Sequence, residues 1–466
     1  MCFRCMEDSN RAWSRQTFGE VDLGHRTRTA RLVTLAASAA ALPGGTVTSV
    51  VRGSAAREGA YRLLESERVP SAKVAEAVFS TTTRSCLARP WVFVPVDGSS
   101  LSFTDRKRKR EVGGVGTWKA GGRGLQVMSA LVCSPRGTPV GLCAQQWWAR
   151  EGRSQYGKRG KTPAQWKKSE TRHGVETMDA VQRRFRAEAP GCTPWLQLDR
   201  GFDSWPVLEK MVRGEIAATV RAQYNRCCRE NRKAKPEYLL DLARKARVLG
   251  SYAVEVPASD SQAARTAVLQ VRARRVTIEL HVGGRRCEHV TLTVVHVKER
   301  GKAKTPLQWT LLTTFTVTTL EQAQTVVRGY ATRWRIEELH RTWKRGGCHV
   351  EDTQLRSREA ILKWATILAA VAARTVRLAY LAREKPDTPA LEELSPSEID
   401  AAILLAKPKG VKRGATPTLG VAVGWIATAG GYTGKSSGGP PGPTVLGRGL
   451  MRVEIAAQVL RDLSTS

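Results

Sequence analysis

The segment from Tyr330 to Lys344 has two chemically different sides, so it must lie between a protein core and a polar surface. It contains no Gly or Pro and is followed by Gly346-Gly347, which predicts a single helix that ends there. At about 100° per residue, the apolar residues Ile336, Leu339 and Trp343 share one side. The opposite side gathers, within about 100°, Tyr330, Arg333, Trp334, Glu337, Arg341 and Lys344.

The polar side of this predicted helix combines one carboxylate with cations, a phenol and an indole. A carboxylate can bind a metal ion, cations can bind phosphates, and aromatic rings can stack on bases. That combination suits chemistry on a nucleic-acid backbone. The alternative is an ordinary solvated face of an amphipathic helix, so the remainder of the chain has to decide between the two interpretations.

The charge balance indicates a polyanionic partner. The 466 residues include 75 Lys and Arg against 42 Asp and Glu, a net charge of +33. Because the basic residues are spread over the whole chain, nucleic acid fits better than a membrane surface. The longest apolar stretch, Ala360 to Ala382, carries Lys363, Arg374 and Arg377, and we expect a packed helix there instead of a membrane span.

The first 85 residues are predicted to be helical. Thr27 to Ala36 has helical apolar spacing, Gly44-Gly45 ends that helix, and Ser54 is the expected N-cap of a second one. Two short basic helices joined by a glycine turn are similar to a helix-turn-helix reader of DNA. A helical bundle without a DNA role is the alternative. In the DNA-binding interpretation the contacts include Arg28, Arg31 and Arg62.

From about residue 90 the pattern changes to short apolar runs that are typical of strands. Further runs between Asp199 and Glu337 predict an inserted antiparallel sheet over about residues 225–317. Beyond Glu337 the chain is predicted to be helical, with a loop at Ser436 to Pro443. The predicted strands cover Trp91–Val96, Leu125–Cys133, Thr138–Trp148, Trp195–Leu198, Tyr252–Val256, Ala267–Leu280, Val290–Val297 and Leu307–Val317.

Two aspartates come directly after apolar runs: Asp97 after Trp91–Val96, and Asp199 after Trp195–Leu198. A carboxylate just beyond a strand end is held rigidly at the rim of a sheet. Together with Glu337, the two could converge on hard divalent cations, as two-metal phosphodiester chemistry requires. An aspartate taken alone at such a position is more commonly a residue that initiates a turn, and only the combination with Glu337 favours a metal site.

Other catalytic patterns are missing from the chain. It has no G-x-S-x-G elbow, no G-x-x-x-x-G-K-[ST] phosphate loop and no H-E-x-x-H helix. The basic run from Arg106 to Arg110 is interpreted as a loop that contacts phosphates.

Tyr330, Arg333, Glu337 and Lys344 match the pattern Y-x2-R-x3-E-x6-K. This Y-R-E-K signature resembles that of the insertion-sequence-four family of DDE transposases, and the chain is similar to its Tn-five-type cut-and-paste members. The segment Asp199 to Asp203 is similar to that family's D-R-E-A-D motif. The resemblance extends to Gly59–Arg62, Gln146–Trp148 and Thr305–Trp309, and runs from about residue 10 to 380.

The resemblance implies a role for each matching residue. Asp97, Asp199 and Glu337 would be the catalytic, metal-binding triad, holding two Mg²⁺ ions for which Mn²⁺ can substitute. Other residues would bind DNA, with Trp309 stacking on a flipped base of a DNA hairpin and Trp334 wedging into the gap. The remaining DNA contacts implied are Tyr330, Arg333, Lys344, Arg341 and Arg221.

Two positions depart from the family pattern. Gly201-Phe202 replaces the usual pair in the second-aspartate segment, and Arg341 stands where a lysine is common. Neither departure removes a metal ligand.

We therefore expect a mixed α/β fold with a ribonuclease-H-like catalytic core and an inserted antiparallel β-sheet. Residues 1–85 would form a helical domain that binds transposon ends, 86–370 the catalytic domain, and 371–466 a helical dimerisation region. The expected activity is cut-and-paste transposition of double-stranded DNA by a homodimer, in the bacterial cytoplasm at the nucleoid and without a membrane partner. Two alternatives stay open: a metal-dependent nuclease without strand transfer, and an inactive or regulatory DNA-binding relative.

Overall fold

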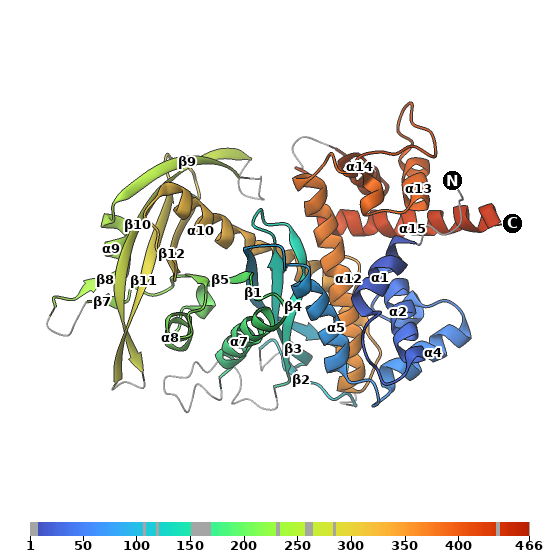
Figure 1. Ribbon diagram of the computed structural model, residues 1–466, viewed down its shortest axis with the longest axis horizontal. Helices are drawn as coiled ribbons and strands as arrows, with labels where there is room; N and C mark the ends of the chain where they lie inside the picture. The colour runs from blue at the N-terminus through green and yellow to red at the C-terminus, as the bar shows by residue number, and fades with distance from the viewer. Residues whose placement is uncertain are drawn as a thin grey trace.

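The computed structural model describes residues 8–105, 109–117, 121–150, 169–229, 234–256, 264–282, 286–434 and 439–465. It shows a mixed α/β fold with a helical N-terminal region, a mixed sheet and further helices at the C-terminal end (Figure 1). The basic run Arg106 to Arg110 and the predicted loop Ser436 to Pro443 lie partly outside the described residues.

All twelve described strands belong to one sheet, in the order β2-β3-β1-β5-β6-β12-β11-β10-β7-β8, with β4 beside β3 and β9 beside β10. Pairing is parallel for β1–β5 and β5–β6, and antiparallel elsewhere. The strands are β1 (Trp91–Ser102), β2 (Gly113–Val115), β3 (Gly122–Cys133), β4 (Pro139–Trp148), β5 (Thr193–Leu198), β6 (Ala218–Arg221), β7 (Cys227–Cys228), β8 (Glu237–Tyr238), β9 (Val248–Val256), β10 (Arg265–Val282), β11 (Arg286–Glu299) and β12 (Gln308–Thr313).

Between Asp199 and Glu337, the strands from β7 to β12 pair only in antiparallel fashion, whereas β6 pairs in parallel with β5. Long β10 and β11 pair over fourteen residues, and β12 adds to β11. The insertion is not a separate sheet, because β12 also pairs with β6 of the central part. Figure 1 shows these strands at the end of the molecule away from both termini.

Helices cover the sheet and form the two terminal regions. The helix α12 is the longest of those described. The helices are α1 (Ser9–Phe18), α2 (Arg26–Ala41), α3 (Val47–Val50), α4 (Ser54–Glu65), α5 (Ser71–Arg84), α7 (Thr171–Glu188), α8 (Trp205–Arg213), α9 (Leu239–Lys245), α10 (Leu320–Thr332), α11 (Trp334–Lys344), α12 (Arg358–Glu384), α13 (Pro396–Ala406), α14 (Leu419–Ala429) and α15 (Pro443–Thr465), with short 3-10 turns η3 (Arg200–Phe202), η4 (Val350–Asp352) and η5 (Ala390–Glu392).

The two faces of the central strands pack against different helices, because side chains alternate along a strand. In β1, Phe93 belongs to the core that includes residues of α10, α11 and α12, whereas Val92, Val94 and Val96 belong to the core that includes α7 and α8. A Cβ on Gly329 of α10 would lie 2.5 Å from the Phe93 ring, so only glycine allows this helix to approach the sheet so closely.

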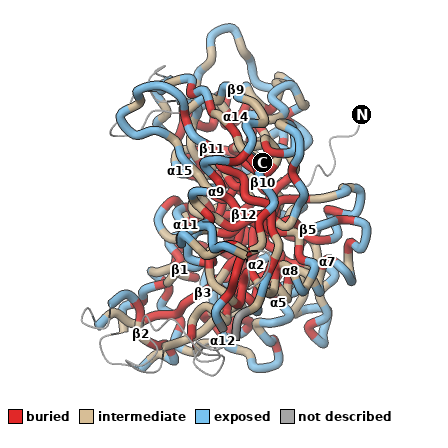
Figure 2. Tube along the Cα trace, turned by 90° about the vertical axis from the view of Figure 1, so that its left-hand side faces the viewer, coloured by how far each residue is buried: buried red, intermediate tan, exposed pale blue. Residues whose placement is uncertain are grey.

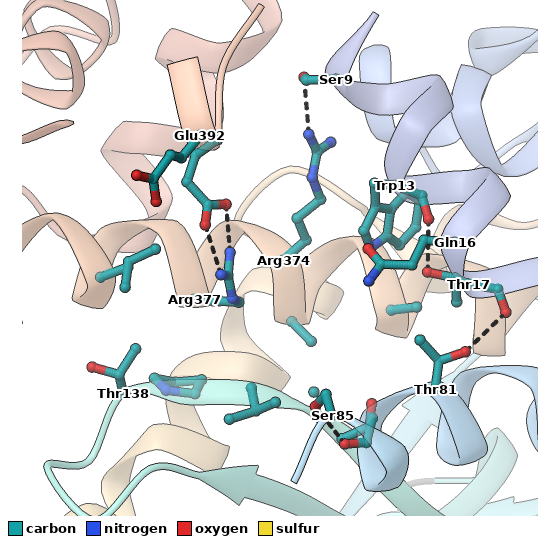
Figure 3. A pocket seen from close by; sticks show the side chains of 18 of the residues that line it. Ser9, Trp13, Gln16, Thr17, Thr81, Ser85, Thr138, Arg374, Arg377 and Glu392 are labelled. Carbon is teal, nitrogen blue, oxygen red and sulfur yellow. Dashed lines mark hydrogen bonds and ion pairs between the residues drawn. The ribbon is translucent and has the colours of Figure 1, made fainter. Parts of the chain in front are cut away.

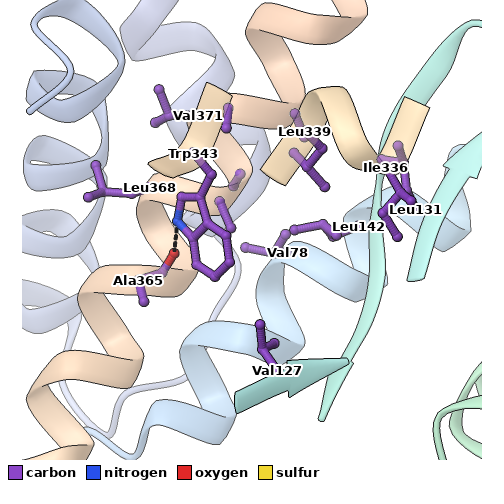
Figure 4. Packing of buried hydrophobic residues seen from close by; sticks show 14 of the residues in the cluster. Val78, Val127, Leu131, Leu142, Ile336, Leu339, Trp343, Ala365, Leu368 and Val371 are labelled. Atoms are coloured by element: carbon purple, nitrogen blue, oxygen red, sulfur yellow. Dashed lines mark hydrogen bonds between the residues drawn. The ribbon is translucent and has the colours of Figure 1, made fainter. Parts of the chain in front are cut away.

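The helix α12 is the packing centre between the N-terminal helices and the central sheet. Its residues Ala365, Leu368 and Val371 surround the buried indole of Trp343, whose Nε1–H donates to the Ala365 carbonyl at 3.1 Å (Figure 4). The helix is long and apolar enough to cross a membrane by length and composition, but 78% of its most apolar window is buried in the fold. It is therefore a core helix, and Figure 2 shows buried segments concentrated along the middle of the molecule.

Three local predictions were wrong. The segment Tyr330 to Lys344 is two helices that meet at Arg333, not one. Ser54 lies inside α4, whose N-cap is Gly53 with φ of 83°. The first strand does not stop at Val96 but continues to Ser102, because its later half pairs with β3 after the pairing with β5 has ended.

Candidate active site

Asp97 and Asp199 lie on neighbouring parallel strands at the point where those strands separate. Val96 and Leu198 form the last pair of the β1–β5 ladder, and each aspartate is the next residue along its strand. After Asp199 the chain turns into η3, where Asp199 Oδ1 accepts a hydrogen bond from the Gly201 amide at 2.7 Å. Asp97 Oδ1 accepts from the Gly98 amide at 2.8 Å. Both carboxylates are thus fixed by the backbone beside them.

Glu337 reaches the same place from the first turn of α11, and Arg333 connects it with Asp97. The Arg333 guanidinium donates to Asp97 Oδ2 at 3.1 Å and to Glu337 Oε1 at 2.6 Å. Arg333 itself is only 8% exposed. The carboxylates predicted from the sequence therefore lie together, with one buried cation between two of them.

The three carboxylates also interact through their charge. Burial raises the pKa of Asp97 to about 6, and the negative charges of Asp199 and Glu337 act in the same direction, while the positive charge of Arg333 opposes them. Hard oxygen donors whose charges repel one another are the donor set that divalent cations such as Mg²⁺ and Mn²⁺ prefer. The residues present thus fit divalent metal ions.

A tighter group of carboxylates exists elsewhere, formed by Asp8, Glu398 and Glu454, whose oxygens lie within 4.8 Å of one another. Its hydrogen bonds are internal: Asn10 and Arg461 donate to Glu454 at 3.1 and 2.6 Å, and Glu398 caps its own helix. This cluster joins the start of α1 to the C-terminal helices α13 and α15.

Two further signature residues occupy different environments. Tyr330 is 4% exposed and belongs to the core, although the one-helix prediction placed it on the polar side. Lys344 donates from Nζ to the carbonyl of Ser100 at 2.7 Å, three residues beyond Asp97 on the same strand.

The aromatic candidates differ in exposure. Trp334, at the start of α11, is 53% exposed, and the Arg333 guanidinium carbon lies 5.2 Å from the centroid of its ring. Trp309 in β12 is half-buried and makes an edge contact with Tyr330 at 5.5 Å between ring centroids. Arg221 lies at the end of β6, opposite Leu311 of β12. Arg341 is exposed on α11.

The candidate DNA contacts of the N-terminal helices also differ. Arg31 is exposed on α2. Arg62 is exposed on α4 and forms an ion pair with Glu58 of the preceding turn. Arg28 is half-buried and donates to the Leu23 carbonyl at 2.9 Å, so part of its hydrogen-bonding capacity holds the start of α2.

A cleft of about 560 Å³ opens next to the two aspartates, and sequence reasoning missed most of its walls. The only signal was the alternation of polar and apolar residues in β3 and β4, which also fits an ordinary half-buried strand. The lining residues are Asp97, Gly98, Ser99, Ser100, Gln126, Met128, Trp148, Glu170, Thr171, Gly174, Asp199, Gly201 and Phe202.

A larger cavity, of about 630 Å³, lies away from the aspartates between α1, α5, the β3–β4 turn and α12. Figure 3 shows Arg374 and Arg377 of α12 pointing into it, with Trp13 and Ser9 on the opposite wall. Arg374 donates to Ser9 Oγ at 3.0 Å and Arg377 forms an ion pair with Glu393. These contacts tie α1 and the segment around Glu393 to α12.

Two segments of the chain match known protein families. Residues 163–373 match the transposase DDE domain, and residues 10–69 match a transposase DNA-binding domain. The first match contains Asp199, Arg333 and Glu337. Asp97 precedes it in sequence, and the pairing of β1 with β5 brings it to the site. The second match contains Arg28, Arg31 and Arg62.

Proposed function

Because the chain is a DDE transposase with its own DNA-binding domain, a metal-dependent enzyme that cleaves DNA and transfers strands, we propose that it moves DNA by a cut-and-paste route. In this proposal it belongs to the insertion-sequence-four family, binds the inverted repeats at transposon ends and cleaves both strands through a DNA hairpin. It then joins the freed 3′ ends to target DNA.

The observation that carries the proposal is the proximity of three carboxylates: Asp97 and Glu337 contact Arg333, and Asp199 lies beside Asp97. Residues more than a hundred positions apart supply carboxylates to one rim of the sheet, and Arg333 contacts two of them. A structural ion pair would need one carboxylate for one guanidinium. Here repulsion by Asp199 helps to raise the pKa of Asp97. Such unfavourable repulsion between carboxylates is typical of a catalytic metal site.

Asp97, Asp199 and Glu337 would hold two Mg²⁺ ions, or Mn²⁺ in their place. When bound, such ions activate the attacking oxygen and stabilise the leaving oxygen of the phosphodiester. The protein's part is to position them: the amides of Gly98 and Gly201 fix the two aspartates, and α11 fixes Glu337.

The surrounding residues would position the DNA. Arg333, next to the carboxylates, and Lys344, beside Ser100, are close enough to the site to neutralise phosphates there. The remaining proposed contacts with the transposon end are made by Tyr330, Arg341 and Arg221. The exposed ring of Trp334 is available to wedge into a hairpin, and Trp309 to stack on its flipped base.

The larger organisation follows the same proposal. The central strands and their helices would be the ribonuclease-H-like core, with the end-binding domain at 1–85, the catalytic domain at 86–370 and dimerisation through 371–466. The boundary at 370 falls inside α12, so the last two parts share one continuous helix. A synapsed homodimer acting at the bacterial nucleoid completes the proposal.

The proposal is tested by incubating the protein with labelled duplex DNA that carries the inverted repeat flanking its gene, with Mg²⁺ present. The wild type should release a hairpin-ended fragment and then insert precleaved ends into a plasmid, while Glu337→Gln should only retard the DNA in a gel. Cleavage without hairpins or joined products would replace the proposal with a plain nuclease. Binding without cleavage in Mg²⁺ or Mn²⁺ would replace it with a regulatory DNA-binding protein.

A further inference from the structure

The cleft beside Asp97 and Asp199 lies on the opposite face of the sheet from the signature helices. In β3, Val127 and Leu131 belong to the core that includes α11 and α12, whereas Ala130 and Val132 belong to the core that includes α7. Gln126 shares the α7 side, because side chains two residues apart point to the same face. The two aspartates therefore separate the Arg333 side of the site from this cleft.

Ser100, Gln126 and Trp148 form a row across the cleft. Gln126 is directly opposite Ser100 of β1 on one side and Trp148 of β4 on the other, and all three line the cleft. Strand pairing fixes the spacing of this row relative to Asp97, three residues before Ser100 on the same strand. The row thus begins beside Asp97 and extends away from α10 and α11.

Gln126 has hydrogen-bonding capacity that the described part of the protein does not use. Its side chain is 7% exposed, and its buried Nε2 has no hydrogen-bond partner among the described residues. A buried unpaired amide costs about 1–3 kcal/mol, so such a group in a binding cleft indicates a ligand that pairs with it. A carboxamide offers a donor and an acceptor together, which matches the edge of a nucleobase.

The other walls suit a base better than a phosphate. None of the described lining residues is cationic, whereas Glu170 adds a carboxylate to those of the two aspartates. Glu170 is already bound by Arg150, and it accepts from Trp148 Nε1–H at 3.2 Å. The Trp148 ring also stacks on His173, with centroids 4.1 Å apart. The apolar part of the cleft wall is formed by Met128, Phe202 and the Trp148 ring.

We propose that this cleft binds the first nucleotide beyond the scissile phosphate, on the side away from the signature helices, and that Gln126 pairs with the edge of its base. That nucleotide belongs to the flanking DNA during cleavage and to the target DNA during strand transfer. The proposal rests on the transposase function proposed above and assigns Gln126 as a specificity-determining residue of its second DNA side.

The test combines an enzyme variant with a substrate that lacks one base. Gln126→Met keeps the side-chain length and removes the carboxamide. Gln145→Met on neighbouring β4 is the matched control. Gln145 does not line the cleft; its Nε2 donates to Ser129, and its buried Oε1, like Gln126 Nε2, has no partner among the described residues. Each protein is given end DNA with an intact flank, or with an abasic site at the first flanking nucleotide, and the rate of first-strand cleavage is measured.

Removing the base should slow the wild type and Gln145→Met about tenfold, the value of one good base contact. Gln126→Met should be about tenfold slower on the intact flank and show no further loss on the abasic one. Equal abasic penalties in Gln126→Met and wild type would overturn the proposal, as would wild-type rates for Gln126→Met. Retardation of precleaved ends, which lack the flank, should be the same for all three proteins and shows that each is folded. Failure of the wild type to cut any end would instead overturn the proposed function.

Discussion

The guanidinium of Arg333 lies 2.6 Å from the carboxylate of Glu337, four residues further along the chain, although Arg333 belongs to neither of the helices that it joins. The same guanidinium contacts Asp97 on β1. The junction between α10 and α11 is thereby fixed to the sheet at the position where chemistry is proposed. Changes at this junction should therefore affect catalysis before they affect the fold.

Loss of one triad carboxylate should abolish cleavage and spare DNA binding. In Asp199→Asn the side-chain volume is kept and one negative metal ligand is lost, so we expect cleavage at least about a thousandfold slower, because metal ions contribute several kcal/mol to such reactions. The N-terminal helices that are proposed to bind the ends are unchanged. Cleavage kinetics and gel retardation, measured on the same end DNA, test this expectation. Cleavage within tenfold of wild type would remove Asp199 from the proposed triad.

Neutralising Asp97 should stabilise the metal-free protein. The pKa of Asp97 is raised from 3.8 to about 6 by burial and by the charge of Asp199. The folded state thus holds this proton more tightly than the unfolded state, and stability falls as pH rises from about 4 to about 6. At pH 8 without metal, Asp97→Asn should raise the free energy of unfolding by roughly 1–3 kcal/mol. The lost ion pair between Asp97 and Arg333 lowers this gain.

Urea denaturation at pH 4 and pH 8, with EDTA present, measures this effect. Adding Mg²⁺ should stabilise the wild type more than Asp97→Asn, because the ion neutralises the repulsion that the substitution has already removed. A variant less stable than wild type in EDTA at pH 8 would show that the pairing with Arg333 outweighs the repulsion.

Substitutions of the two candidate tryptophans, Trp334 and Trp309, should differ in their effects on stability. Trp334→Ala removes an exposed ring, so unfolding should change by less than about 0.5 kcal/mol, while hairpin formation should slow by roughly five- to a hundredfold, the value of one stacked base. Trp309→Ala should slow hairpin formation similarly, but it also removes packing against Tyr330 and should lower stability by about 1–3 kcal/mol. Hairpin yield and thermal melting of both variants, with Trp334→Phe as the partial rescue, distinguish stacking from packing.

Lys363 should hold the N-terminal helices onto α12. Its side chain is 1% exposed, and Nζ donates to the carbonyls of Leu64 and Ser66 at 2.8 Å each. Lys363→Met leaves both carbonyls unpaired and should destabilise the protein by about 2–4 kcal/mol. The exposed Lys385, at the end of the same helix, is the control, and Lys385→Met should change stability by less than about 0.5 kcal/mol. Similar melting temperatures for the two variants would contradict this role.

Local patterns predicted the longer strands, but not the short strands β2, β6, β7 and β8, and they placed Asp97 at a strand end although it lies inside β1. Asp199 directly follows its strand, as predicted, because apolar alternation and a turn-forming residue are both local signals. The helix break at Arg333 could not be predicted, because no Gly or Pro lies there. The contact of Arg333 with Asp97 depends on a strand more than two hundred residues away in the sequence. The pairing of β12 with β6 and the cleft at Gln126 likewise arise from neighbours that are distant in sequence.

The burial of α12 has a consequence for the folding of the protein during its synthesis. Residues of α2 and α4, including Leu32 and Leu64, share one core with Ile361, Trp364 and Leu368 of α12. The helices α2 and α4 are synthesised some three hundred residues before α12. During most of its synthesis the N-terminal DNA-binding part therefore has uncovered apolar surface. It reaches its final packing only after Glu337, which precedes α12 in the sequence, has been synthesised.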